Sequence, residues 1–483
     1  MKTGRRAAAV FLLGTLGLLV AACAHYPLNA RLTEYRADGG YRFDPLLADE
    51  KADELFVCLS FSGGGTRAAA FAYGVMKSLR ETTIPLRGTT VSFLSEVDCI
   101  SSVSGGSFTA AYYGLFGDRI FTEFEDRFLR RDIESELFWR VLSPINWARL
   151  ASPYWSRIDL AAELYDETVF KERTFAELIA SPRRPFIIMN ATRLANGSRF
   201  QFTQEEFDFL GSDLSEYKVA RAVAASSAFP VLLSPLSLWS YPPPAGSSPP
   251  EDYVQALKSA AADQGRYYRA LHRMELMTGD RKYIHLMDGG LADNIGLRTI
   301  MAGWESTDGF ILRRMNDGGI KRLVVIAVNA RTDPPEYLSS SERPPGLGSV
   351  AYKVATVSME NYSFDTVDLM RRLEQGRDQL QRTTADCQRH LDKSCPSAPP
   401  VDQLRRVPAC IVEVSFEAIQ PEGRRGEFLG LPTSFALSGR QVDALIQIGG
   451  ELLAQNRDFQ KLLRALRGEP SLGAGVGEKG NCS

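Results

Sequence analysis

Two glycine-rich segments and one distant carboxylate supply the residue types that acyl transfer requires. Ser62–Arg67 contains three consecutive glycines, and Ser102–Gly106 has a serine at its centre. Far downstream, the segment Asp288–Gly290 reads Asp-Gly-Gly. A serine nucleophile, a group that takes its proton and a loop of free backbone N–H groups are the parts that form and stabilise a tetrahedral intermediate. These three segments are therefore the candidate site.

Ser104 is the candidate nucleophile. Ser102–Gly106 approaches the nucleophile elbow, Gly-x-Ser-x-Gly, in which a strand turns abruptly into a helix and strains the middle serine. Gly106 matches that pattern, and Ser102 is the mildest replacement for its first glycine. The helix that follows directs its N-terminal partial positive charge at this position. A strand-to-helix turn without chemistry fits the same five residues.

Gly63, Gly64 and Gly65 are the candidate oxyanion hole. Phosphate-binding loops also place glycines between a strand and a helix, so a nucleotide site is the alternative. However, no Gly-Lys-Ser/Thr follows, and Ala68 stands where the last glycine of Gly-x-Gly-x-x-Gly would be. We therefore expect N–H groups of this loop to hold the negative oxygen of a tetrahedral intermediate, where the loss of one donor typically costs about 3 kcal/mol.

Asp288 is the candidate base, because no histidine lies in a recognisable triad context. It follows the apolar run Tyr283–Met287, and the two glycines after it permit close backbone approach. His285, within that run, is expected to be a packed or hydrogen-bonded core histidine. A second Asp-Gly-Gly begins at Asp317 among charged residues, which predicts a solvated turn, so Asp288 is favoured.

These motifs must be positioned by the strands and helices that flank them. Continuous apolar runs predict buried strands at 55–61, 97–101, 185–190, 283–287, 323–329 and 411–416. Helical spacing of apolar residues follows the first two runs, at 67–79 and 108–115. This alternation predicts an α/β fold whose layered sheet is covered on both faces. Two stretches, 118–165 and 240–280, interrupt it and are expected to be insertions that cap the sheet.

The three motifs, in this order, resemble those of the patatin-like phospholipases, a family that uses a Ser–Asp dyad. The resemblance assigns roles as follows: Gly63, Gly64 and Gly65 to the oxyanion loop with Thr66 and Arg67 in support, Ser104 and Gly106 to the nucleophile turn, and Asp288, Gly289 and Gly290 to the Asp-Gly-Gly motif. Residues 224–230 also resemble an Ala- and Ser-rich segment of the family. The similarity extends from about residue 55 to 330, and more weakly to 465.

The resemblance implies a patatin-like three-layer fold, with a central, mostly parallel sheet flanked by helices, and helical cap insertions. It also implies hydrolysis of acyl ester bonds in membrane lipids through an acyl-enzyme, with Ser104 as nucleophile and Asp288 as base. No cofactor and no metal are expected. Two alternatives stay open: an esterase acting on neutral lipids or lysolipids, and a catalytically silent, lipid-binding envelope lipoprotein.

The N-terminus predicts an exported, lipid-anchored protein. Basic residues precede a short apolar run within residues 1–22, the pattern of a signal peptide. The run ends at Leu19–Cys23, which resembles the lipobox of bacterial lipoproteins, so Cys23 is the candidate lipidation site. An ordinary cleaved signal peptide is the alternative. Ala24, in place of aspartate, favours the outer membrane of the bacterial cell envelope.

Composition is that of a globular chain, with 44% hydrophobic and 24% charged residues. The net charge of −2 becomes −5 without the three basic residues of the leader, so we expect no nucleic-acid partner. Membrane lipids are the expected substrate, and the sequence does not identify any protein partners. We expect 23–52 to be a lipid-anchored lead-in, 53–467 to be one catalytic domain and 468–483 to be a flexible tail.

Cysteines and aromatic residues give less specific expectations. Cys58 and Cys99 lie in apolar runs and are expected to be buried thiols. No pairing among the C-terminal cysteines follows from sequence alone; these are Cys387, Cys395, Cys410 and Cys482. The first insertion carries Phe138, Trp139, Leu142, Ile145, Trp147, Tyr154 and Trp155. Such residues line an acyl groove, contact a bilayer interface or form the insertion's own core. Arg67 either meets a lipid phosphate or forms a structural ion pair.

Overall fold

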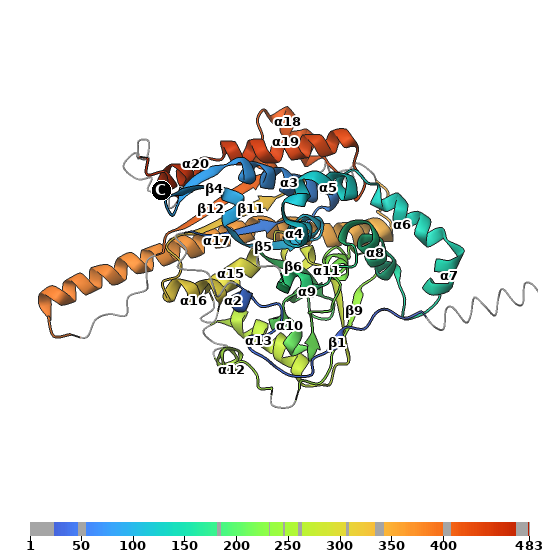
Figure 1. The fold of residues 1–483 in the computed structure, drawn as a ribbon, viewed down its shortest axis with the longest axis horizontal. Coiled ribbons are helices and arrows are strands. Elements are labelled where there is room, and N and C mark those ends of the chain that lie inside the picture. The colour runs from blue at the N-terminus through green and yellow to red at the C-terminus, as the bar shows by residue number, and fades with distance from the viewer. Residues whose placement is uncertain are drawn as a thin grey trace, which may run out of the picture.

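The apolar runs of the sequence form one central sheet (Figure 1). The computed structural model describes residues 24–46, 55–180, 185–230, 232–244, 247–258, 263–305, 309–333, 342–398, 407–469 and 482. Its strands, in spatial order, are β12 (Ala409–Ser415), β11 (Leu323–Asn329), β2 (Phe56–Phe61), β5 (Val97–Val103), β6 (Phe186–Arg193), β10 (Tyr283–Asp288) and β9 (Leu236–Trp239), and β7 (Arg199–Gln201) pairs with β6. The predicted signal peptide, Cys23 and most of the predicted tail lie outside the described residues.

The strands from β12 to β6 are parallel, whereas β10 and β9 are antiparallel to their neighbours. Every residue of β2, β5, β6 and β11 is buried. Parallel strands covered on both faces read as continuous apolar runs, which is why these strands could be predicted from sequence. The mostly parallel sheet confirms the predicted α/β fold class.

Helices cover both faces of this sheet (Figure 1). They are α2 (Phe43–Leu46), α3 (Gly65–Glu81), α4 (Gly105–Phe116), α5 (Ile120–Phe124), α6 (Ile133–Leu142), α7 (Pro144–Leu150), α8 (Arg157–Tyr165), α9 (Phe175–Ala180), α10 (Gln204–Phe209), α11 (Val219–Ser226), α12 (Glu251–Lys258), α13 (Gln264–Met277), α14 (Gly290–Asp293), α15 (Leu297–Glu305), α16 (Phe310–Asn316), α17 (Leu347–Ser394), α18 (Glu422–Leu429), α19 (Gly439–Gln455) and α20 (Arg457–Leu466). Short 3₁₀ helices lie at Phe93–Glu96, Gly117–Arg119 and Phe416–Ala418. Short π-helices lie at Glu125–Leu129 and Asp166–Phe170. Within the described residues, no helix combines the length and the apolar character needed to cross a bilayer.

Small elements complete the architecture. Two antiparallel pairs lie outside the main sheet: β1 (Ala30–Arg31) with β8 (Ser212–Asp213), and β3 (Thr83–Leu86) with β4 (Thr89–Ser92). Both predicted insertions are helical: α5 to α8 occupy the first, and α12 and α13 the second.

The long helix α17 was not predicted. It has 48 residues, and its C-terminal part extends well beyond the body of the molecule (Figure 1). Buried apolar side chains such as Ala355, Met359, Val367 and Met370 lie on one face, whereas most other described side chains of the helix are partly or fully exposed. Because so few positions are buried, the apolar periodicity that marks an ordinary packed helix is weak here.

The two apolar cysteines are not free thiols, which corrects the sequence-based expectation. Cys58 of β2 and Cys99 of β5 form a disulfide, with their Cα atoms 4.7 Å apart. The register of these neighbouring parallel strands pairs the two residues directly. A second disulfide joins Cys410 to Cys482, whereas Cys387 and Cys395 are free and exposed.

Removing the sheet disulfide should destabilise the protein. The double variant Cys58→Ala/Cys99→Ala is expected to lower the free energy of unfolding by about 2–4 kcal/mol, because the bond closes a loop of 41 residues in the unfolded chain. Denaturant unfolding measures this difference. Cys387→Ala/Cys395→Ala is the matched control and should change stability by less than about 0.5 kcal/mol. Alkylation of Cys58 or Cys99 in the folded, unreduced protein would show that the bond is absent.

Candidate active site

Ser104 occupies the sharp turn between β5 and α4, as the sequence predicts. Its backbone angles are φ 49° and ψ −120°, so it is one of few non-glycine residues with positive φ. This conformation is strained for an L-residue and persists only where its surroundings impose it. Ser104 is 6% exposed and lies at the N-terminal end of α4. The turn thus presents the hydroxyl next to the positive end of a helix.

A chain of buried hydroxyl groups fixes the backbone of this turn. The Ser104 N–H donates to Oγ of Ser226 at 2.9 Å, and Ser226 donates to the carbonyl of Asn190 at 2.7 Å. The hydroxyl of Ser107 lies 2.9 Å from that of Ser226 and donates to Ser102 at 3.1 Å. Ser102, the departure from the glycine pattern, therefore belongs to the network that holds the strained turn. Sequence reasoning assigned no role to Ser226, Ser107 or Asn190.

Strand register brings Asp288 to the level of Ser104. Val103, the residue before Ser104, pairs with Asn190 of β6, and Asp288 pairs with the next residue of β6, Ala191. The two candidate catalytic residues consequently lie at the same height on either side of one strand. Because β10 runs antiparallel to β6, this juxtaposition depends on the mixed topology of the sheet.

Asp288 is buried and held in place by its own neighbours. Its Oδ1 accepts a 2.8 Å hydrogen bond from the N–H of Gly290, and Thr192 donates to its carbonyl at 2.8 Å. Burial raises the pKa of Asp288 from 3.8 to about 7, against the lowering effect of hydrogen bonds from Gly290 and the Ser104 hydroxyl. A carboxylate with this pKa is a much stronger base than an exposed aspartate.

Gly64 and Gly65 provide the free N–H groups that the sequence predicts. Both have positive φ, 137° and 60°, and their N–H groups donate to no atom in the part of the chain that the structure describes. Gly63 is different, which corrects the prediction: its N–H donates to the carbonyl of Asn294 at 2.8 Å. A Cβ on Gly63 would nevertheless come within 3.3 Å of the Ser104 Cβ, so the loop lies against the serine.

The remaining glycines of the motifs allow backbone segments to touch. A Cβ on Gly105 would lie 2.0 Å from the carbonyl oxygen of Gly65, which closes α4 onto the glycine loop. Side chains at the other positions would also collide: Gly106 with the Ser62 carbonyl at 2.7 Å, Gly289 with the Asn190 carbonyl at 2.3 Å, and Gly290 with Asn294 at 2.8 Å. These contacts explain the small residues of the motifs without reference to chemistry.

Thr66 and Arg67 attach the glycine loop to the C-terminal part of the chain. The Thr66 N–H donates to the carbonyl of Ser434 at 2.9 Å. The buried guanidinium of Arg67 donates to the carbonyls of Ala330 (3.0 Å) and Leu431 (2.8 Å) and to the hydroxyl of Thr433 (3.1 Å). Arg67 therefore makes structural hydrogen bonds to neutral groups.

The candidate residues surround a small cavity of about 40 Å³. Its walls include Gly63, Gly64, Arg67, Ser104, Asp288 and Asn294, together with Phe229 and with Thr356 and Met359 of α17. Phe229 and Met359 pack together with Ala355 and Leu291 above the site. A larger cavity of about 370 Å³, lined by residues of α10, α12 and α13, includes none of the predicted site residues.

Other candidate residues lie away from this cavity. His285 is exposed on β10 and hydrogen-bonds to Ser237 at 2.8 Å, so it is hydrogen-bonded but is not a core residue. Asp317 is exposed in the turn after α16, as expected. Of the aromatic residues in the first insertion, Trp155 is buried, whereas Trp139 and Trp147 are exposed.

The family model described as patatin-like phospholipase matches residues 59–301, which contain all three motifs. The chain belongs to the patatin-like phospholipase family. Membership agrees with the observed fold.

Two solved structures are similar to this chain at low sequence identity. Human GIVD cytosolic phospholipase A2 is similar at 12% identity and a TM-score of 0.42, over 88% of this chain and 64% of that chain. VipD from Legionella pneumophila is similar at 11% identity and a TM-score of 0.28, over 89% of this chain and 70% of that chain. The chain thus spans less than two thirds of the length of the human protein. No curated protein matches it.

Replacing Asp288 should stabilise the protein at high pH. The pKa is about 7 in the folded state and near 3.8 when the carboxyl is solvated, so wild-type stability falls as the pH rises from about 4 to about 7. Asp288→Asn removes that loss and should raise the free energy of unfolding by up to roughly 4 kcal/mol at pH 8, and by much less near pH 4. Denaturant unfolding at several pH values measures the difference. The exposed control Asp317→Asn should show little pH-dependent change. A pH-independent effect of Asp288→Asn would contradict the buried, titrating carboxyl.

Proposed function

We propose that the protein hydrolyses acyl esters of membrane lipids, with Ser104 as nucleophile and Asp288 as its base. One observation carries the proposal: both side chains line one cavity, beside a glycine loop with free N–H groups. A positioned hydroxyl, a basic carboxylate and unengaged amides are the parts that acyl transfer needs. The family supports lipid substrates.

In the acylation step, the Asp288 carboxylate accepts the Ser104 proton while the serine oxygen attacks the ester carbonyl carbon. Electrons of the carbonyl π bond move onto its oxygen, and the N–H groups of Gly64 and Gly65 stabilise the resulting oxyanion. The oxyanion then re-forms the carbonyl and expels the alcohol, which takes the proton from Asp288. The fatty acyl group remains on Ser104 as an ester.

In the deacylation step, the same groups act on water. Asp288 accepts a proton from water as its oxygen attacks the acyl-serine, and the glycine loop again holds the oxyanion. Collapse breaks the bond to the Ser104 oxygen, which recovers the proton from Asp288, and releases the fatty acid. A base with a pKa of about 7 is ionised from neutral pH upward, so both steps favour neutral to alkaline conditions.

Substrate entry requires the cavity to open. A volume of about 40 Å³ holds little more than a water molecule, whereas lipid-sized ligands occupy pockets of several hundred Å³. Phe229 and Met359 are the apolar side chains of its described lining. We infer that their displacement admits the acyl chain and that they line its first methylene groups.

The dyad variants test the proposed mechanism. Ser104→Ala and Asp288→Asn should each lower turnover about a thousandfold or more, and the double variant should be no worse, because the two residues act as one unit. Release of fatty acid from phospholipid, lysophospholipid and diacylglycerol measures activity and separates the phospholipase from the esterase alternatives. Asp317→Asn is the matched control and should keep nearly full activity. Full activity in Asp288→Asn would exclude the dyad, and inactivity of the wild type on every ester would support a silent lipid-binding protein.

We further propose that Cys23 carries lipid and anchors the protein in the cell envelope, as the lipobox-like Leu19–Cys23 indicates. Both described disulfides fit an oxidising compartment, which supports export. Cys23→Ser should release the protein from membranes or leave an unprocessed precursor, as measured by fractionation and intact mass. Identical processing and fractionation of wild type and variant would exclude the anchor.

A further inference from the structure

Helices α6 and α7 carry an apolar surface that no described part of the chain covers. Phe138, Trp139 and Leu142 of α6 are exposed, as are Ile145 and Trp147 of α7. Trp139, Ile145 and Trp147 are 69%, 71% and 58% exposed to solvent. Tyr154, a few residues further on, is also exposed. From residue 138 to residue 154, every exposed side chain is apolar or aromatic, including Pro144, Ala151 and Pro153. We name Phe138, Trp139, Leu142, Ile145 and Trp147 the α6–α7 surface.

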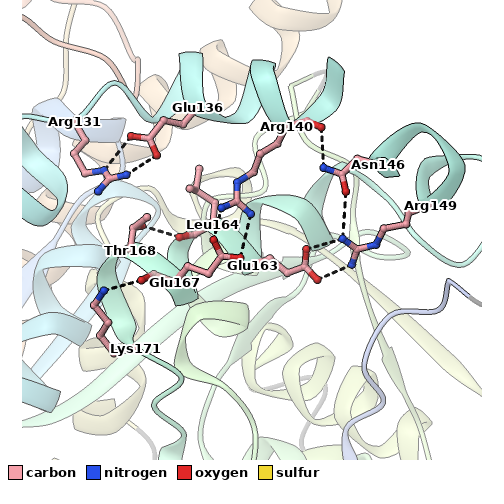
Figure 2. Close-up of polar contacts among 10 residues, drawn as sticks. All are labelled: Arg131, Glu136, Arg140, Asn146, Arg149, Glu163, Leu164, Glu167, Thr168 and Lys171. Atoms are coloured by element: carbon pink, nitrogen blue, oxygen red, sulfur yellow. Dashed lines mark hydrogen bonds and ion pairs between the residues drawn. The ribbon is translucent and has the colours of Figure 1, made fainter. Parts of the chain in front are cut away.

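The two arginines of these helices are engaged in ion pairs. Figure 2 shows Arg140 of α6 and Arg149 of α7 reaching toward α8 and the turn that follows it. Arg140 pairs with Glu167, and Arg149 makes hydrogen bonds of 3.0 and 2.6 Å to Glu163. Arg149 also stacks on the buried Trp155, with 3.9 Å between the guanidinium carbon and the ring centroid. These contacts attach α6 and α7 to α8 and the turn that follows it, while the apolar side chains stay exposed.

A hydrogen-bonded corner keeps the two helices in one orientation. Asn146 donates to the carbonyl of Arg140 at 2.8 Å and accepts from Arg149 at 3.3 Å (Figure 2). Pro144 opens α7 immediately after α6 ends at Leu142. Only Ile133 of the two helices is buried, so they contribute little to the core. Helices α6 and α7 stay outside the core and expose the indoles of Trp139 and Trp147, which favours contact with an apolar environment.

The described chain begins beside this surface. Ser152, two residues after α7, donates to the carbonyl of Ala24 at 2.6 Å, and the Tyr26 N–H donates to the carbonyl of Tyr154 at 2.9 Å. The ring of His25 stacks on Tyr154 with 5.1 Å between centroids. The candidate lipidation site, Cys23, is the residue that precedes Ala24 in the chain. A lipid anchor there would consequently be attached next to the α6–α7 surface.

We propose that the α6–α7 surface docks onto a lipid bilayer and enters its interfacial layer. Tryptophan together with large aliphatic side chains is the combination that partitions into this layer, and an amphipathic helix binds it with its apolar face down. Because each of the two arginines is paired with a glutamate, binding rests on the apolar side chains and does not require anionic lipid. The proposal rests on the proposed function in one respect only: docking would hold the protein on the membrane that contains the lipid substrate of Ser104.

Fluorescence quenching tests the proposal separately from catalysis. The full chain carrying Ser104→Ala, which consumes no lipid, is mixed with phosphatidylcholine vesicles brominated on their acyl chains. Docking should quench Trp139 and Trp147, and added salt should not reverse it. Phe138→Ser/Ile145→Ser keeps both tryptophans as reporters. It should raise the lipid concentration needed for half-maximal quenching at least about tenfold.

The matched control is Tyr268→Ser/Leu380→Ser, which removes two exposed apolar side chains from α13 and α17. Its tryptophan fluorescence should be quenched to the same extent as that of the parent chain. Absence of quenching in the parent, or equal quenching in the surface and control variants, would overturn the proposal. A dimer in solution that the surface variant converts to a monomer would also overturn it, because a second copy would then be the occupant.

A catalytic comparison completes the test. With Ser104 intact, Phe138→Ser/Ile145→Ser should hydrolyse vesicle lipid at least about tenfold more slowly, and a short-chain soluble ester at the wild-type rate. Equal loss on both substrates would contradict docking as the cause. Inactivity of the wild type on both substrates would refute the proposed function alone, since quenching still decides the docking proposal.

Discussion

Burial of a single carboxylate is the constraint on which the proposed chemistry depends. An exposed aspartate is too weak a base for a serine hydroxyl, and desolvation raises the pKa of Asp288 to about 7. The sheet must therefore bury this group and still keep it at the level of Ser104. Antiparallel pairing of β10 with β6 does both, because β10 ends with Asp288 opposite Ala191, where Asp288 is buried and lines the same cavity as Ser104. The same burial costs stability at neutral pH, a common compromise at functional sites.

The strained serine imposes a second requirement, which the surrounding hydroxyl groups meet. A positive φ at Ser104 is maintained by the hydrogen bond from its N–H to Ser226, and Ser226 is in turn fixed by Asn190 and Ser107. Closely packed glycines then bring the free N–H groups of the glycine loop against the serine. Arg67 ties that loop to residues 330 and 431–433, so the oxyanion donors depend on contacts with distant parts of the chain.

Features encoded by neighbouring residues could be predicted from the sequence, and those that depend on register between strands could not. The buried strands follow from continuous apolar runs, and the turn at Ser104 follows from its small neighbours. By contrast, the Cys58–Cys99 disulfide and the role of Ser226 depend on which residues of separate elements lie opposite one another. Helix α17 escaped prediction because few of its residues are buried, and His285 was misplaced because the outer face of β10 is exposed. The engagement of Gly63 by Asn294 likewise joins residues far apart in the chain.

Covalent labelling of the nucleophile tests the central claim most directly. A long-chain alkyl fluorophosphonate transfers its phosphonyl group to an activated serine, and peptide mass mapping locates the adduct. We expect one adduct, on Ser104. Its rate of formation should fall as the pH drops below about 7, and Asp288→Asn should not form it. An adduct on another residue, or labelling of Asp288→Asn at the wild-type rate, would contradict the Ser104–Asp288 dyad.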